Sequence, residues 1–354
     1  MKLFSLTLPY ILLVTFYTAP LNDFGTRRLG ALDGSPYDGV AVPLVRAYDT
    51  KRYKYEDFKG AVAKLKGADG TAVWPWVFFN RFVGYEEGGR AGSPESKHVY
   101  FSSIRGMDLY DEWGALGDFY DMWKTSLRIA RDLGSPGIVA DPETYNNYDA
   151  YKVSYVAEKT GKTKEEVKER LREIGRELGR IADETYPGAT IWFLFTGLGN
   201  PMKTLNPFDE DDYRTVTYII EGMLSHAAKN GSALTVVSGG EVSLGYCSRS
   251  LEALKSKVAS RRKSFGKSLA AYPNLKLGGT IAPWNDSGAR TGWMRTGDCG
   301  KSELRTAVDF KPLIKQLAAS YGYVWIYAAK AAGYNPYRDG EAGAWNREVA
   351  GTDK

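Results

Sequence analysis

Short runs of apolar residues recur along the chain, each bounded by Gly, Pro, Asn or Asp. Runs of this length that are rich in β-branched and aromatic residues are typical of strands buried on both faces. The pattern predicts eight strands, near residues 11–17, 39–45, 72–79, 137–143, 190–195, 233–241, 275–284 and 323–329.

Segments with a helical period separate these strands. They cover residues 50–65, 116–133, 163–185, 212–229, 250–271 and 310–321. The clearest begins at Thr163, whose hydroxyl can accept from the amide of Glu166 while the Glu166 side chain reaches back, a capping box.

Alternating buried strands and helices predict a parallel sheet, and eight such units predict an α/β fold of the (β/α)8 TIM barrel type with elaborated loops at the C-terminal ends of its strands. A doubly wound open sheet is the alternative, but no Gly-rich phosphate-binding turn follows the first strand. One domain over residues 1–354 is expected, because barrels of this kind commonly exceed 250 residues.

The first twenty residues fit two interpretations. They combine Lys2, an apolar stretch and a small residue near the end, as a secretory signal peptide does. However, Pro9 interrupts the stretch, and residues 11–17 have the composition of a strand, which we favour. Since no other apolar run approaches the ~20 residues needed to cross a bilayer, no membrane span is expected.

Composition is ordinary for a globular protein apart from the aromatic residues. The chain has 24 Tyr, 14 Phe and 9 Trp, many beside Gly, Asn or Asp at predicted strand ends. This placement predicts a surface that stacks on flat ligands, in addition to a large core. The net charge is +5, and Lys and Arg alternate with Glu in residues 163–180, as on a solvated helix face. Nucleic-acid binding is not expected, because no element combines a basic stripe with aromatic residues.

Histidine and cysteine usage argues against metal and triad chemistry. The two histidines, His98 and His226, stand apart from any cluster with metal-ligand spacing, so neither a zinc site nor a Ser-His-Asp triad is expected. Cys247 and Cys299 fall in predicted loops, where a disulfide and two free thiols both remain open. The sequence therefore predicts neither a metal nor an organic cofactor.

Two carboxylates stand at the end of the fourth predicted strand. Residues 137–143 read GIVADPE, and alternation places Asp141 and Glu143 on the same side, facing the barrel mouth. Acidic residues are poor strand formers and costly to bury, so the pair needs partners or a chemical role. An ion pair that ties a loop to the barrel is the structural alternative, with three candidate partners: Arg46, Arg81 and Arg105.

Paired carboxylates suit cleavage of a glycosidic bond, in which a protonated acid donates to the leaving oxygen and a second group stabilises the positive sugar. Two like charges raise the pKa of one member of the pair, which keeps its proton in place near neutral pH. Glu143 has the longer reach and is the predicted general acid, with Asp141 assisting. Glu241, after the sixth strand, is a further catalytic candidate, as nucleophile or base opposite Glu143; it could instead cap a helix or pair with a loop.

Polar and aromatic residues at other strand ends are expected to line a cleft for carbohydrate. Long connections over residues 80–117, 144–162 and 285–309 leave the C-terminal ends of predicted strands, where barrel sites are built. Trp74 and Trp192 are assigned to packing. The predicted substrate-binding residues are Tyr48, Trp76, Asn80, Arg81, Tyr145, Tyr246, Trp284, Asn285, Asp286 and Trp325.

At Asp141 and Glu143 the sequence resembles the chitinase-like barrels of glycoside hydrolase family 18. In that family the Glu of an Asp-x-Glu pair on strand four is the acid, the Asp positions the 2-acetamido group of the sugar, and a Trp lies on strand eight; Trp325 looks like that Trp. Val139 and Pro136 stand where the family has further Asp residues, and family 25 lysozyme-like barrels also carry the pair. The resemblance implies a glycoside hydrolase of this group, retaining if a substrate group or Glu241 is the nucleophile.

Two other readings remain. The first is a carbohydrate-binding barrel without turnover, because some chitinase-like barrels are lectins. The second is an aldolase or isomerase barrel. Such enzymes usually use a Schiff-base lysine, a metal cluster or a phosphate-binding loop. Of these features, the predicted strand ends offer only a lysine, Lys330. Digestion of external polymers would fit a secreted protein. The sugar, its linkage and the oligomeric state stay open.

Overall fold

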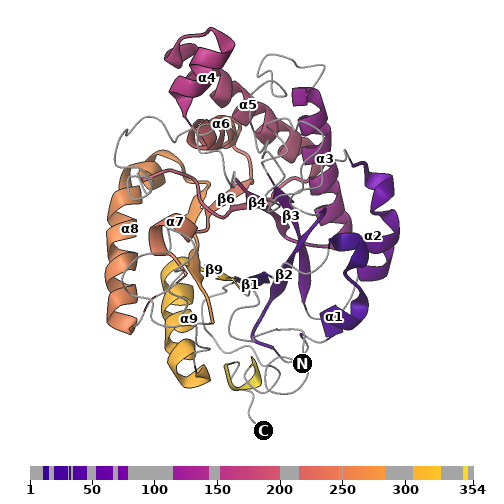
Figure 1. Cartoon of the computed structure of the whole chain (residues 1–354), viewed down its shortest axis with the longest axis vertical. Coiled ribbons are helices and arrows are strands. Elements are labelled where there is room, and N and C mark those ends of the chain that lie inside the picture. Colours follow the sequence, from indigo (N-terminus) through magenta and orange to yellow (C-terminus); the bar gives the residue numbers. More distant parts are fainter. Residues whose placement is uncertain are drawn as a thin grey trace, which may run out of the picture.

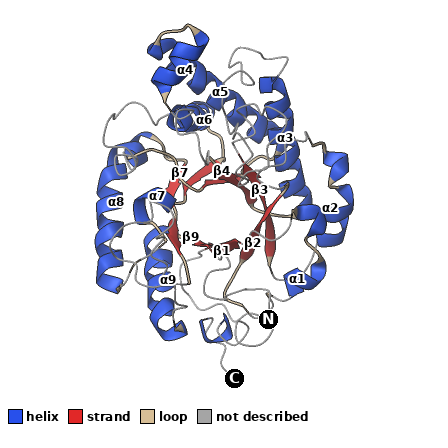
Figure 2. Cartoon of the chain, in the orientation of Figure 1, coloured by secondary structure: helices blue, strands red, loops and turns tan. Residues whose placement is uncertain are grey.

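Strands and helices alternate along the chain and form a (β/α)8 barrel, with the strands in a central ring and the helices outside it (Figures 1 and 2). The computed structural model describes residues 11–15, 20–30, 32, 35–45, 53–66, 71–78, 115–142, 152–199, 215–246, 248, 250–283, 306–327 and 346–349. No helix in this part of the chain has both the length and the apolar character that a membrane crossing requires.

The strands are all paired in parallel, in the order β7-β6-β5-β4-β3-β2-β1-β9-β8. Only Gly278 separates β7 from β8, so these two segments are one interrupted barrel strand, and the ring closes through them. The bounds are β1 (Ile11–Thr15), β2 (Gly39–Pro43), β3 (Ala72–Phe78), β4 (Gly137–Asp141), β5 (Thr190–Phe193), β6 (Thr235–Ser238), β7 (Leu275–Leu277), β8 (Gly279–Ile281) and β9 (Tyr323–Tyr327).

Each strand lies inside the range expected for it, with two differences. Residues 233–241 were expected as one strand, but β6 ends at Ser238, because Gly240 adopts a left-handed backbone (φ 87°) that an extended strand cannot contain. The seventh strand is interrupted at Gly278. Both differences fall at the same side of the barrel, between β6 and β8.

The six expected helices are present, and short helices accompany them in the described ranges, including a helical turn at residues 346–349. The α-helices are α1 (Thr26–Gly30), α2 (Lys59–Leu65), α3 (Ala115–Leu133), α4 (Val153–Thr160), α5 (Lys164–Thr185), α6 (Thr215–Asn230), α7 (Glu241–Leu244), α8 (Leu251–Ala271) and α9 (Ala307–Tyr321), and 3-10 turns cover η1 (Leu21–Asp23) and η2 (Tyr55–Asp57). The sequence did not predict α1, α4 and α7, since helices of one or two turns show too little periodicity.

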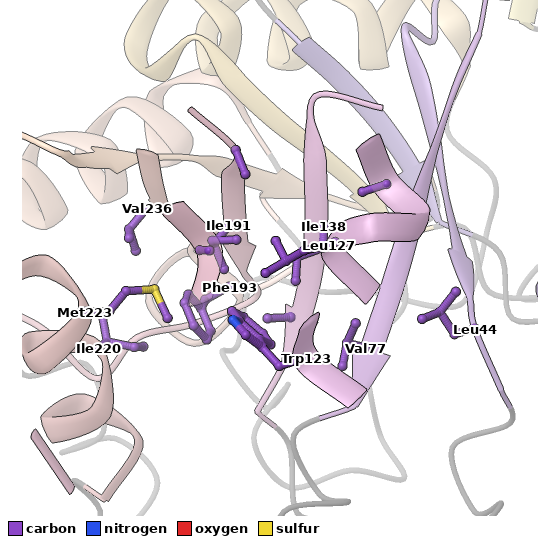
Figure 3. Packing of buried hydrophobic residues seen from close by; sticks show 14 of the residues in the cluster. Leu44, Val77, Trp123, Leu127, Ile138, Ile191, Phe193, Ile220, Met223 and Val236 are labelled. Carbon is purple, nitrogen blue, oxygen red and sulfur yellow. The ribbon is translucent and has the colours of Figure 1, made fainter. Parts of the chain in front are cut away.

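Several strands are buried on both faces, as the completely buried β2, β4 and β5 show. On β3, Trp74, Trp76 and Phe78 point into the barrel, while Val73 and Val77 point out towards the helices. Figure 3 shows part of this outer layer, in which residues of the strands meet side chains of α3 and α6. The labelled residues are Leu44, Val77, Trp123, Leu127, Ile138, Ile191, Phe193, Ile220, Met223 and Val236.

The predicted capping box at Thr163 is confirmed. The Thr163 hydroxyl accepts from the Glu166 amide at 3.2 Å, and the Glu166 carboxylate accepts from the Thr163 amide at 2.8 Å. These bonds satisfy two backbone donors that the first turn of a helix leaves without partners. They fix where α5 begins.

Candidate active site

Among the described residues, four indole rings lie in the barrel interior: Trp74, Trp76, Trp192 and Trp325. All are at most 1% exposed. Trp76 meets Trp325 edge to face, with ring centroids 5.5 Å apart, and Trp74 meets Trp192 in the same way at 5.9 Å. Edge-to-face contacts place the positive ring edge on the negative ring face, which adds to the gain from burial.

Asp141 is the last residue of β4 and is completely buried. It lies on the same side of the strand as Val139, which belongs to the inner cluster, whereas Ile138 and Ala140 belong to the outer one. Alternation therefore directs the carboxylate of Asp141 into the barrel at the C-terminal end of its strands. Glu143, two positions further on, lies outside the described residues.

Glu241 follows β6 and begins α7. The amide of Gly239 donates to the carbonyl of Phe193 at 2.7 Å, and the amide of Glu241 donates to the carbonyl of Leu194 at 3.1 Å. Leu194 in turn donates its amide to the carbonyl of Ala140 at 3.1 Å. Leu194 thus joins the strand end that carries Asp141 to the turn that carries Glu241.

Tyr246 holds the side chain of Glu241. Its hydroxyl donates to Oε1 of Glu241, and its ring stacks on Tyr327 with centroids 4.4 Å apart and planes 19° apart. The carbonyl of Tyr246 accepts from the amide of Ala282 at 2.9 Å. Glu241 and Tyr246 are only 4% and 3% exposed, so both belong to the interior of this end of the barrel.

Two functional candidates were missed from the sequence. Tyr327 ends β9, and its position two residues after Trp325 on an alternating strand was the available signal. Arg261 is the other: it follows buried Leu254 and Val258 at helical spacing, so an arginine occupies an apolar position of α8.

Arg261 lies against the β6 turn and is 2% exposed. Its Nη2 donates to the carbonyl of Ser238 at 2.6 Å and to Oγ of Ser238 at 3.2 Å, and its Nη1 donates to the carbonyl of Gly278. The guanidinium also lies 5.2 Å and 5.1 Å from the ring centroids of Phe265 and Tyr321. Burial lowers the pKa of Arg261, which Tyr321 partly opposes.

Several buried polar atoms in the described part of the barrel have no hydrogen-bond partner, among them Nε1 of Trp74, Trp192 and Trp325 and Oγ1 of Thr280. Trp325 and Thr280 are neighbours in register across β8 and β9. Since buried polar groups are nearly always paired, this donor and this hydroxyl are suited to an oxygen of water or of a ligand.

The remaining predicted site residues lie outside the described ranges. They are Tyr48, Asn80, Arg81, Glu143, Tyr145, Trp284, Asn285 and Asp286, together with Arg46, Arg105, Lys330, Cys247 and Cys299. The expected loop over residues 144–162 contains α4. Within the described ranges, no three His, Cys, Asp or Glu residues are grouped so as to hold a metal ion.

Neither a protein-family model nor a curated protein matches this chain. Among solved structures, the chain is similar to endo-glycoceramidase II from Rhodococcus sp., with 10% identity, coverage of 96% of this chain and 79% of that one, and a TM-score of 0.49. It is similar to a thermostable mutant of a xylanase from Cellvibrio japonicus, with 13% identity, 90% and 86% coverage and a TM-score of 0.46.

A sugar phosphate isomerase/epimerase from Parabacteroides distasonis is also similar, with 13% identity, 98% and 94% coverage and a TM-score of 0.40. Identities are low and these neighbours differ in activity. The comparison therefore selects neither a family nor an activity for this chain.

Proposed function

We propose that this protein is a glycoside hydrolase acting on an oligo- or polysaccharide, with Glu143 as general acid/base and Asp141 assisting. The observation that carries the proposal is the complete burial of Asp141 on the inward side of β4, at the end of the barrel where Glu241 also lies. A buried carboxylate is costly unless it is paired or has a chemical role, and barrels build their active sites at this end.

In this proposal Glu143 donates its proton to the glycosidic oxygen as the bond breaks, and later accepts a proton from the attacking water. Asp141 orients either a substrate substituent or that water. Trp76 and Trp325 are buried in the barrel interior, so the proposal assigns stacking on sugar rings to other aromatic residues of the predicted set, such as Tyr145 and Trp284.

The Glu241–Tyr246 contact favours a variant of the proposal with two separate carboxylates. A hydroxyl that donates to Oε1 holds the carboxyl group in one orientation, as a nucleophile or base requires. Glu143 would then act from the β4 side and Glu241 from the β6 side. A separation of about 5 Å between their carboxyl groups is expected for a double displacement, and about 6.5–9.5 Å for inversion.

Release of reducing ends from a panel of polysaccharides tests the proposal. Wild type should release them, and Glu143→Gln should lower kcat by about 10²-fold or more, because the general acid is lost. Asp141→Asn and Glu241→Gln identify the second group, since the larger loss of kcat marks the assisting carboxylate. Glu165→Gln, at an exposed carboxylate of α5, is the matched control and should leave turnover unchanged.

Two outcomes would contradict the proposal. Wild type and Glu143→Gln that bind a glycan equally, with no product from either, would indicate a carbohydrate-binding barrel without turnover. Neither binding nor product on any member of the panel would remove the carbohydrate assignment altogether.

A further inference from the structure

The turn that carries Glu241 lies where the barrel sheet is interrupted. β6 is in register with β7 as far as Ser238 and Leu277, and the next residue of that neighbouring strand, Gly278, is outside the ladder. The amide of Gly278 still donates to the carbonyl of Ser238 at 2.7 Å. Beyond this bond, the ladder between β6 and β7 does not continue in the described residues.

The guanidinium of Arg261 lies against these two strand ends. It donates to the carbonyl of Ser238 at the end of β6 and to that of Gly278 between β7 and β8. A planar fork with several N–H groups can join two acceptors at once, which a lysine ammonium on a flexible stem does much less well. Among the described residues Arg261 forms no ion pair, so its charge is balanced by carbonyl dipoles and aromatic rings.

Arg261 lies so close to Gly240 that there is little room for a side chain at this position. A Cβ at Gly240 would lie 3.0 Å from Cζ and Nη1 of Arg261 and 3.0 Å from the carbonyl oxygen of Gly278. The left-handed backbone of Gly240 also disfavours any side chain there. Arg261, the turn at Gly240 and the strand break at Gly278 are therefore in close contact. Glu241 is the next residue along the chain after this turn.

We propose that Arg261 is a positioning residue, whose guanidinium replaces the missing sheet ladder between β6 and β8 and so sets the Gly239–Gly240 turn that presents Glu241 to Tyr246. The inference rests on the proposed function only for the role of Glu241 in catalysis. The positioning itself is a property of the folded chain and can be measured without substrate.

The test compares Arg261→Lys with Arg262→Lys, the neighbouring exposed arginine on α8, which donates to the carbonyl of Ser320. In Arg261→Lys, amides of residues 239–246 should exchange with deuterium at least about tenfold faster, while those of α3 and α5 keep their protection. Arg262→Lys should leave residues 239–246 unchanged. Unchanged exchange at residues 239–246 in folded Arg261→Lys would overturn the proposal.

If Arg261→Lys does not fold, Arg261→Gln provides the second measurement, because its amide group can donate to one of the two carbonyls but cannot join both, and it leaves Gly240 unchanged. Local acceleration at residues 239–246 supports the proposal, and its absence contradicts it.

Turnover adds a separate readout. On a substrate that wild type hydrolyses, Arg261→Lys should lower kcat by about tenfold or more with KM little changed, since a displaced carboxylate loses transition-state contacts. An equal loss of kcat in Arg262→Lys would contradict this. An inactive wild type would remove the proposed function, while the exchange result would still decide the role of Arg261.

Discussion

Gly175 of α5 and Gly222 of α6 lie where these two helices touch backbone to backbone. A Cβ at Gly175 would lie 1.8 Å from the carbonyl oxygen of Ile219, and one at Gly222 would lie 2.1 Å from that of Arg172. Distances this short cannot be relieved by rotating a side chain, because both obstacles are backbone atoms. We expect Gly175→Ala to lower the free energy of unfolding by about 1–3 kcal/mol, the usual cost of overpacking, as measured by urea denaturation.

The control for this prediction is Gly266→Ala in α8, where a Cβ would meet nothing within 4 Å. There the higher helix propensity of Ala should stabilise the protein by up to about 1 kcal/mol. If Gly175→Ala lowers the free energy of unfolding and Gly266→Ala raises it, the contact between α5 and α6 is the cause of the destabilisation. A stabilising Gly175→Ala would contradict the close approach of the two helices.

At the scale of a single element, the N-terminus of α5 depends on its capping box. Thr163→Ala removes the acceptor for the Glu166 amide, so we expect the free energy of unfolding to fall by about 1 kcal/mol. Thermal or urea unfolding followed by circular dichroism measures this change. Ser256→Ala, at an exposed position inside α8, should change it by less than about 0.5 kcal/mol. Equal effects of the two substitutions would argue against the cap.

The outer face of α5 carries paired charges, which agrees with the solvated face expected from its sequence. Arg176 donates to Glu169 at 2.7 Å, and Arg170 donates to Glu173 at 2.9 Å. Exposed pairs of this kind contribute little each. The hydrogen bond from Arg176 does lower the pKa of Glu169, which bears on the pH dependence of the whole molecule.

For the molecule as a whole, four carboxyl groups predict a loss of stability in acid. Hydrogen bonds lower the pKa of three of them: Glu166 accepts from the amide and hydroxyl of Thr163, Glu169 from Arg176, and Glu177 from Arg180. Burial alone would raise the pKa of Asp132, but hydrogen bonds from Tyr55 and Arg131 outweigh it and the pKa is lowered.

A folded-state pKa below the unfolded value means that the unfolded chain binds protons first as the pH falls. The stabilisation is therefore complete above the unfolded values of about 3.9 for Asp and 4.3 for Glu, and it is lost as the pH falls through the lower folded values. We expect the urea midpoint to be constant between about pH 7 and pH 5.5 as far as these groups are concerned, and to fall towards pH 3.

The double variant Glu169→Gln and Glu177→Gln should have a shallower fall in the urea midpoint between pH 5 and pH 3, because two of the four groups no longer titrate. A wild-type midpoint that stays constant or rises over this interval would contradict the prediction. A double variant as acid-sensitive as wild type would assign the effect to other carboxyl groups.

Much of the barrel could be predicted because its strands and helices carry local patterns. Most strands are apolar runs, several of them buried on both faces, and Thr163 with Glu166 marks a helix start by residue type and spacing alone. The inward direction of Asp141 also follows locally, since alternation on β4 relates it to Val139. Glu241 was expected at a strand end for the same reason, although its place in α7 was not.

Sequence alone therefore determined the α/β barrel, the order of its elements and the side of β4 to which Asp141 belongs, because periodicity and capping act over a few neighbouring residues. Tertiary structure alone decided the break at Gly278, the place of Arg261 between Ser238 and Gly278, and the contact of Tyr246 with Glu241 and Tyr327. Ring closure brings these groups together across strands that are distant in the chain, and no local pattern encodes which side chain fills a gap between them.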